Sequence, residues 1–420
     1  MEEINLSRNT IQDIPENVTK LDKLRNLNCE ETGLTAFPTA LCNLMGLQVL
    51  NLSQNKISSL PSASSHLKNM ISLKELYMNN CDLRGWSQLY LQIKMQILHL
   101  NNNQIHGIPP EVSNLMFLEE LRLHKNSISH VPDYISNFKL LKVLDLSCNT
   151  IVEVDETLGD LEHLEILLLQ NNQISLFPDS ASKLSNLVEL NLSENRIEKL
   201  PDVSKWTKLK FLDISNNRIK CIPNGFCYLT KLEKLDLTLN NITYLPDDFY
   251  NLVNLDFLRL KHNEIESISE KITQMTKLEE INVDNNALGL SGFPLHCLSA
   301  LKNLKHISMN YNFPAPFVVS DELKLLLQQS NVKIDSEFEH ASSILEKLYL
   351  GSANTATSKT YLKSLGITHI LTAAGELPAR FPDVCFHNNF FYFSQSFTYM
   401  IIHVEDSRTS SLRPHFQEWN

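Results

Sequence analysis

The sequence predicts an α/β solenoid in which short parallel strands line a concave face and irregular or briefly helical segments form the convex side. Three observations predict it. The phrase LVELNLSENRI at residues 187–197 has the form LxxLxLxxNxI, and near-copies recur from the first residue to about residue 312. Its asparagine slot returns at a nearly constant interval, and a second apolar set follows each copy. The slot falls at Asn9, Thr32, Asn55, Cys81, Asn103, Asn126, Asn149, Asn172, Asn195, Asn217, Asn240, Asn263, Asn286 and Asn312.

The LxL part of each copy predicts a strand. Alternate residues of a strand point to opposite faces, so Leu190 and Leu192 should point inward while Asn191 faces out. A single turn cannot bury its leucines alone, and stacked neighbours must supply the core. We therefore expect fourteen adjacent strands.

The asparagine slot predicts the bend that follows each strand. Its amide can bond backbone groups that the bend would leave without partners. The isoleucine two residues later begins the set Ile-x-x-apolar-Pro, as at 197–201, 219–223 and 242–246. Proline fixes φ and lacks an N–H donor, so the return segment should be irregular or briefly helical.

These repeats resemble leucine-rich repeats very specifically. Their Ile-x-x-Leu-Pro turns are similar to those of the intracellular Ras-associated class. The resemblance implies an array of about 14 repeats over residues 1–318. Residues 319–340 should follow as a capping helix, at 321–329, and a linker, at 331–340. The long turns after Asn55 and Asn286 should bulge on the convex side.

Composition excludes several classes of function. The chain has 420 residues, a formal charge of −11 and 43% hydrophobic residues. Neither residues 1–320 nor residues 321–420 have the basic surface charge expected of a protein that binds nucleic acid or an acidic membrane. No apolar run approaches the ~20 residues of a membrane helix. The first residues are acidic and already inside a repeat, so no secretory signal is expected. We also expect no cofactor and no metal site.

The eight cysteines indicate a reduced compartment. They are scattered, with no CxxC pair and no cysteine-rich cap around the repeats. This pattern favours an intracellular, cytoplasmic protein over a secreted one.

The concave face is the predicted binding surface. The residue between the two strand leucines varies from copy to copy, and the row beside it includes Val49, Ile97, Val143, Ile166, Phe211 and Phe257. Apolar side chains beside polar anchors are typical of a protein-binding face, although such side chains can also pack on their neighbours. The predicted patch, where aromatic and charged residues adjoin, consists of Phe211, Asp213, Asp236, Phe257 and Arg259. Its expected partner is a protein.

From residue 341 the pattern changes. Residues 344–352 predict a strand, 353–365 a helix, 366–371 a second strand, and 390–404 at least one more. This order indicates an α/β unit. The order of motifs resembles the front half of a dual-specificity phosphatase: LYLGS, a helix, GITHIL, a strand into an acidic loop, and then LRPHF.

The resemblance implies a cysteine thiolate in an HCx5R loop and an aspartate that protonates the leaving group. Asp406 matches the aspartate by position. None of the eight cysteines is followed by arginine at the required spacing, and His296-Cys297 lies inside the last long repeat, where we interpret it as part of the solenoid. Residues 341–420 are therefore expected to form an incomplete phosphatase-like domain, inactive as written, ending about where the catalytic strand should follow.

Three hypotheses remain open. The chain is an intracellular recognition scaffold carrying a phosphatase remnant, or a truncated reading of an active phosphatase acting on phosphotyrosine, phosphoserine or phosphothreonine proteins, or a plain repeat adaptor capped by its tail. In the second, the array would select phosphoprotein substrates. Residues 341–420 are expected to be the least stable part, because an incomplete sheet leaves strand edges unpaired.

Overall fold

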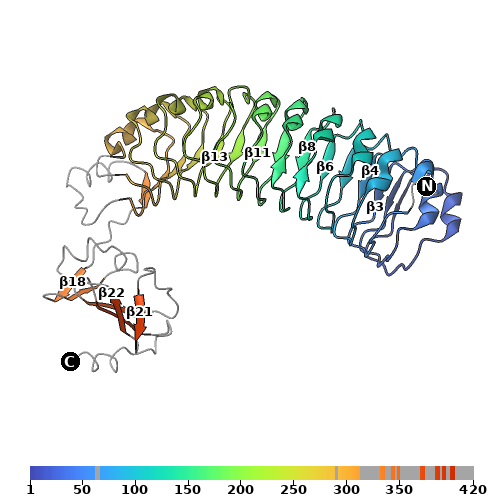
Figure 1. The fold of residues 1–420 in the computed structure, drawn as a ribbon, viewed down its shortest axis with the longest axis horizontal. Helices are drawn as coiled ribbons and strands as arrows, with labels where there is room; N and C mark the ends of the chain where they lie inside the picture. The colour runs from blue at the N-terminus through green and yellow to red at the C-terminus, as the bar shows by residue number, and fades with distance from the viewer. Residues whose placement is uncertain are drawn as a thin grey trace.

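The computed structural model describes residues 1–61, 67–288, 292–312 and 332–335, and six further strands between residues 342 and 402. The described array forms one parallel sheet of fifteen strands in a curved solenoid (Figure 1). Its strands are, in sheet order, β1 (Glu3–Asn5), β2 (Asn26–Asn28), β3 (Val49–Asn51), β4 (Glu75–Tyr77), β5 (Ile97–His99), β6 (Glu120–Arg122), β8 (Val143–Asp145), β10 (Ile166–Leu168), β11 (Glu189–Asn191), β12 (Phe211–Asp213), β13 (Lys234–Asp236), β14 (Phe257–Arg259), β15 (Glu280–Asn282), β16 (His306–Ser308) and β17 (Lys333–Asp335).

Fourteen of these strands are the predicted ones, and each pairs in register with its neighbours. On β11, the side chain of Leu190 is fully buried, whereas Glu189 and Asn191 are partly exposed on the other face. Leu167 and Leu212 lie beside Leu190 on the two adjacent strands. Burying a leucine side chain contributes about 1.5–3 kcal/mol, so the stacked leucine rows hold the array together. The solenoid prediction is confirmed.

The asparagine slot forms the expected ladder. The Nδ2 of Asn195 donates to the carbonyl oxygens of Leu169, Leu192 and Ser193 at 2.9, 3.0 and 3.1 Å. Its Oδ1 accepts the backbone N–H of Ile174 at 3.0 Å. One buried amide thus satisfies backbone groups of two adjacent turns and joins them.

Two of the described turns replace the asparagine. Thr32 donates its hydroxyl to the Cys29 carbonyl at 2.8 Å. Cys81 lies 3.4 Å from the Leu52 carbonyl, and its thiol is a weaker donor than an amide. Both side chains are buried, so the substitution keeps the packing and reduces the hydrogen bonding.

The residue before each slot adopts a left-handed backbone conformation, which sequence reading did not predict. Within the described part of the chain, fourteen non-glycine residues have φ between 51° and 60°. Asparagine, which tolerates this conformation, takes the position at Asn80, Asn102, Asn171, Asn216 and Asn285. Leu239 takes it at a steric cost.

The opposite side of the array consists of short 3-10 helices, as expected for briefly helical return segments. Proline precedes many of them, including Pro223 and Pro246. The helices are η1 (Glu16–Lys20), η2 (Thr39–Asn43), η3 (Leu67–Asn69), η4 (Ser87–Leu91), η5 (Pro110–Asn114), η6 (Asp133–Asn137), η7 (Glu156–Asp160), η8 (Asp179–Lys183), η9 (Asn224–Tyr228), η10 (Asp247–Asn251), η11 (Glu270–Gln274) and η12 (Leu295–Ala300). Two short strands, β7 (His130–Val131) and β9 (Glu153–Val154), pair in parallel between turns.

The predicted linker over 331–340 differs from the structure. Residues 333–335 form β17, which pairs in parallel with β16 and adds a fifteenth strand to the sheet. The Lys333 N–H donates to the Lys305 carbonyl at 2.8 Å, and Val332 packs against the core. The exposed edge of β16 is thereby covered. The predicted capping helix at 321–329 and the serine-rich bulge at 62–65 lie outside the described residues.

The C-terminal strands form two small sheets. β18 (Ser342–Leu345) pairs antiparallel with β19 (Leu348–Leu350), where one continuous strand was predicted. The predicted strand is thus two short strands that pair with each other. The second sheet has the order β20-β23-β22-β21, with β20 (His369–Ala373), β21 (Val384–His387), β22 (Phe390–Phe393) and β23 (Thr398–Ile402). β20 and β23 are parallel, and the strands expected near 366–371 and within 390–404 are present.

Candidate functional site

The five predicted patch residues lie on three neighbouring strands of one sheet face. Phe211 begins β12 and Phe257 begins β14, while Asp213, Asp236 and Arg259 end β12, β13 and β14. Strand register places them in two parallel rows, an upper row that contains the phenyl rings and a lower row that contains the charges.

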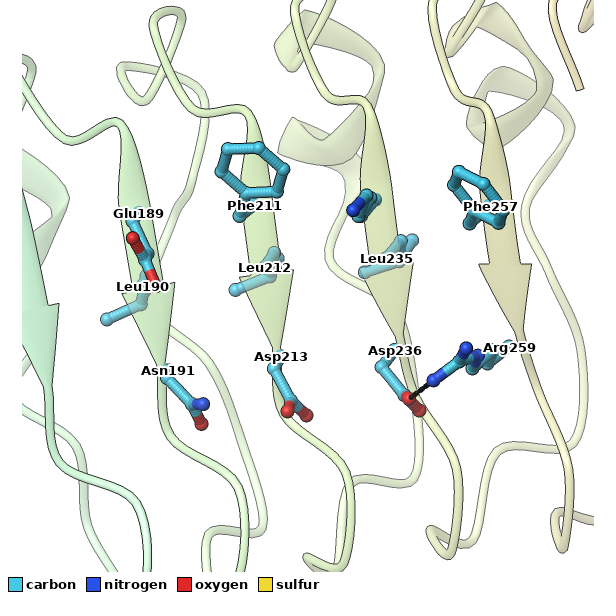
Figure 2. A pocket seen from close by; sticks show the side chains of 11 residues that line it. Glu189, Leu190, Asn191, Phe211, Leu212, Asp213, Leu235, Asp236, Phe257 and Arg259 are labelled. Carbon is cyan, nitrogen blue, oxygen red and sulfur yellow. Dashed lines mark ion pairs between the residues drawn. The ribbon is translucent and has the colours of Figure 1, made fainter. Parts of the chain in front are cut away.

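These residues line one hollow of about 310 Å³ on the strand face (Figure 2). The two phenyl rings lie at one end of the strands, and the Asp236–Arg259 ion pair lies at the other. The hollow is lined by Glu189, Leu190, Asn191, Phe211, Leu212, Asp213, Lys234, Leu235, Asp236, Phe257 and Arg259. The structure thus brings all five predicted residues together.

Lys234 completes the upper row and was missed by sequence reading. It lies in register between Phe211 and Phe257. Its ammonium nitrogen is 5.5 Å from the centre of the Phe211 ring and 5.4 Å from the centre of the Phe257 ring. A cation at this distance is attracted to a ring face by about 0.5–1 kcal/mol at an exposed site. Lys234 therefore lies between the two rings and makes a weak cation–π contact with each.

Two acidic residues extend the upper row. Glu189 pairs in register with Phe211 on one side, and Glu280 pairs with Phe257 on the other. Together with the lower row, the face carries the four carboxylates of Glu189, Glu280, Asp213 and Asp236 against the two cations of Lys234 and Arg259. These six side chains therefore have a formal net charge of −2, and the lining of the hollow, which excludes Glu280, has −1.

In the lower row, the carboxylates of Asp213 and Asp236 lie on adjacent strands. Arg259 Nη1 is 3.6 Å from Asp236 Oδ2. Burial raises the pKa of Asp213, and the neighbouring Asp236 charge also raises it, although hydrogen bonds from Ser215 and the charge of Arg259 act in the opposite direction. The ionised form of Asp213 is thus disfavoured by its partly buried position.

The fold does not require a carboxylate at Asp213. Its Oδ1 accepts the Ser215 N–H and hydroxyl at 3.0 and 2.7 Å. On the preceding strand, Asn191 accepts the Ser193 N–H and hydroxyl at 2.9 and 2.7 Å. An amide makes the same local contacts without the cost of a buried charge. The charge at Asp213 therefore needs an explanation outside the local fold.

A second polar cluster lies on β4 to β8. The Tyr77 and His99 rings meet edge to face with centres 4.9 Å apart, and His99 Nε2 is 2.8 Å from a Glu120 oxygen. Arg122 donates to the same Glu120 oxygen and lies 3.9 Å from Asp145. Burial lowers the pKa of His99. These groups satisfy one another, which leaves fewer contacts for a partner than the hollow around Phe211 and Phe257.

Asp406, the candidate general acid, lies outside the described residues. Within the described ranges, no helix combines the length and apolar character needed to cross a bilayer.

Comparison with known families identifies repeats along most of the array. The family described as leucine-rich repeat region matches residues 133–241 and 198–350, which together span more than half of the chain. Two related families, a two-copy leucine-rich repeat and a leucine-rich repeat, match residues 46–88 and 93–151.

Individual proteins are similar over shorter stretches. MAP kinase phosphatase with leucine-rich repeats protein 2 of Dictyostelium discoideum is 38% identical over 18% of this chain, and dual specificity protein phosphatase 1 of Arabidopsis thaliana is 31% identical over 24%. The matched stretches span 9% and 45% of those relatives' own lengths. A leucine-rich repeat protein of Leptospira interrogans superposes with a TM-score of 0.71 at 29% identity, covering 80% of this chain and 84% of its own.

Proposed function

Because the chain belongs to the leucine-rich repeat family, we propose that it is a recognition scaffold whose concave face binds a protein partner through the hollow around Phe211 and Phe257. The array itself is a scaffold suited to protein–protein interaction, since parallel strands present a long continuous face with variable side chains. The proposal places the centre of that binding surface at the hollow.

One observation carries it. Asp213 carries a negative charge that its own turn does not require, next to a second carboxylate and on the same strands as the two phenyl rings. Binding sites retain charges that cost stability, because those charges are needed when the partner arrives. Aromatic side chains have few rotatable bonds and lose little entropy on contact, which suits them to anchor a partner.

The chemistry of the hollow indicates the partner. A net negative rim favours a basic side chain, which would lie against Asp213 and Asp236. The phenyl rings favour an apolar or aromatic side chain beside it. The proposed partner is therefore a protein segment that places an arginine or lysine next to a hydrophobic residue.

Selection from a random peptide library displayed on phage tests this function. The full chain should enrich peptides that pair a basic with a hydrophobic residue. Replacing Phe257 and Arg259 together by alanine should weaken those peptides about 30-fold or more, as expected for a binding centre. Val143→Ala, in the same row on the distant strand β8, is the control and should change little. Selection of no such peptides, or equal affinity in the double variant, would remove the hollow as the binding centre.

We also propose, as a second function, that residues 341–420 are the front part of a dual-specificity phosphatase domain, with Asp406 as its general acid. Relatives whose names include dual specificity phosphatase and MAP kinase phosphatase support this. The parallel pairing of β20 with β23 is consistent with an α/β unit. In that case the array would bring phosphoprotein substrates to the catalytic domain.

The two proposals separate in one experiment. The transcript is read past codon 420, and the protein that it encodes is assayed with an aryl phosphate. An in-frame HCx5R sequence and hydrolysis that depends on its cysteine support the enzyme. A stop codon and no hydrolysis leave the scaffold with an inactive, pseudophosphatase tail.

We further propose a cytoplasmic location, supported by the scattered cysteines. A fluorescent fusion retained in a secretory compartment would contradict it.

A further inference from the structure

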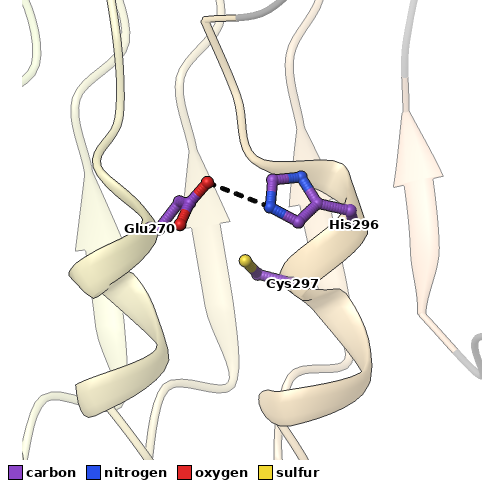
Figure 3. Close-up of side chains that lie close together, drawn as sticks. All are labelled: Glu270, His296 and Cys297. Atoms are coloured by element: carbon purple, nitrogen blue, oxygen red, sulfur yellow. Dashed lines mark hydrogen bonds and ion pairs between the residues drawn. The ribbon is translucent and has the colours of Figure 1, made fainter.

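Three side chains of types that can bind a metal ion lie close together on the helical side of the last described turns. Glu270 lies on η11, and His296 and Cys297 lie on η12 (Figure 3). A carboxylate oxygen, a ring nitrogen and the sulfur all lie within 4.8 Å of one another. The Nε2 atom of His296 is 3.1 Å from Oε1 of Glu270.

Local sequence places these residues side by side. Ser269 caps η11 by accepting the Lys271 N–H at 3.3 Å, so Glu270 opens that helix. Pro294 precedes η12, which places His296 and Cys297 in its first turn. Glu270 and His296 occupy corresponding positions in successive turns of the array, and the two helices therefore stack.

The donor set suits zinc. Zn²⁺ binds imidazole nitrogen, thiolate sulfur and carboxylate oxygen in a tetrahedral arrangement. Bond lengths of about 2.0–2.3 Å at tetrahedral angles put neighbouring donors roughly 3.3–3.6 Å apart. The nitrogen and oxygen are already near that separation, and the sulfur lies within 4.8 Å of both.

Charge and access also fit. A carboxylate, a thiolate and a neutral imidazole would balance the two charges of the ion. The side chains of His296 and Glu270 are 63% and 72% exposed, so an ion can enter from solvent and a water can take the fourth position. The hydrogen bond between His296 and Glu270 needs no metal, and the thiol of Cys297 lies beside it.

We propose that Glu270, His296 and Cys297 form a zinc site that links η11 to η12 and stabilises the last described turns of the array. Since an ion that binds only the folded state adds to its stability, zinc should raise the resistance of this end to unfolding. The site lies outside the hollow and does not depend on partner binding.

Titration of the purified, EDTA-treated full chain with Co²⁺ and then Zn²⁺ tests the site. One equivalent of Co²⁺ should produce a thiolate-to-cobalt charge-transfer absorption that Zn²⁺ abolishes. Cys297→Ser should remove that absorption and Glu270→Gln should weaken binding about 10-fold or more, in the range seen when metal sites lose a supporting group. Cys221→Ser, which removes an exposed cysteine elsewhere, is the control.

A second readout is the unfolding midpoint, which Zn²⁺ should raise in the wild type and in Cys221→Ser but not in Cys297→Ser. Because Cys297 is only partly buried, its variant should fold, and circular dichroism checks this. Absence of stoichiometric binding, or an unchanged absorption in Cys297→Ser, would overturn the site.

Discussion

Asp213 and Asn191 occupy paired positions on adjacent strands and accept hydrogen bonds from the same local groups, although one is charged and the other is not. The pair shows what the turn requires, which is an acceptor, and what it does not require, which is a charge. That difference yields the first prediction.

Asp213→Asn should stabilise the protein at neutral pH and lower its affinity for the partner. The folded pKa of Asp213 is raised above 3.8 by burial, so the folded state holds this proton more tightly than the unfolded chain. Stability is therefore lost as pH rises from the unfolded value through the raised folded pKa, and none is lost below the unfolded value. Urea unfolding at several pH values should show a gain at pH 7 that disappears in acid. A lower stability at pH 7 would contradict this account.

Leu239→Asn should stabilise the array by about 0.5–1 kcal/mol, because asparagine tolerates the left-handed backbone better than leucine. Leu239 has φ of 56° and is 47% exposed, so little packing is lost. The matched control is Asn216→Leu at the same position of the preceding turn, which should destabilise by a similar amount. Urea midpoints measure both, and changes of the same sign would refute the argument.

Removing an amide of the asparagine ladder should lower the free energy of unfolding more than replacing it with a weaker hydrogen-bond donor. Asn195→Ala leaves the Ile174 N–H and buried carbonyls without their partner, and each unsatisfied group costs about 1–3 kcal/mol. Asn195→Cys should be milder, since Cys81 fills this slot naturally. Thermal unfolding of the two variants compares them. Equal losses would mean that the thiol neither fills the slot nor bonds the carbonyls, which would contradict this account.

Residues 341–420 should exchange their amide hydrogens faster than the central strands β10 to β12. The four-stranded sheet has β20 and β21 at its edges, and unpaired edges open readily. Hydrogen exchange followed by mass spectrometry measures this by segment. Protection equal to that of the central strands would show that this segment is an independently stable domain.

The sequence predicts the structure well where the same repeat position has the same structural role in successive turns. A leucine or isoleucine lies at the centre of each of the fourteen predicted strands, and an asparagine fills the slot in all but two turns, so these strands could be located from the sequence. It also located Phe211, Asp213, Asp236, Phe257 and Arg259 on one face, because the regular repeat period brings them into register.

The residues that were missed act through neighbours that are distant in sequence. Lys234 is a charged residue in a row that the sequence marks by its apolar members, although its position between Phe211 and Phe257 follows from the period. Glu270 joins His296 and Cys297 only through stacking, and no short spacing motif spans a whole turn of the array. The left-handed position before each slot escaped notice because no single residue type marks it.

The central claim is that the partner binds in the hollow around Phe211 and Phe257. The most direct measurement is photo-crosslinking of a display-selected peptide that carries a photoreactive group next to its basic residue, followed by mass spectrometry of the cross-linked protein. The account predicts cross-links on the strand face between β11 and β15, and their loss in Phe211→Ala combined with Phe257→Ala. Cross-links on the short helices η8 to η11, or cross-links that persist in the double variant, would contradict it.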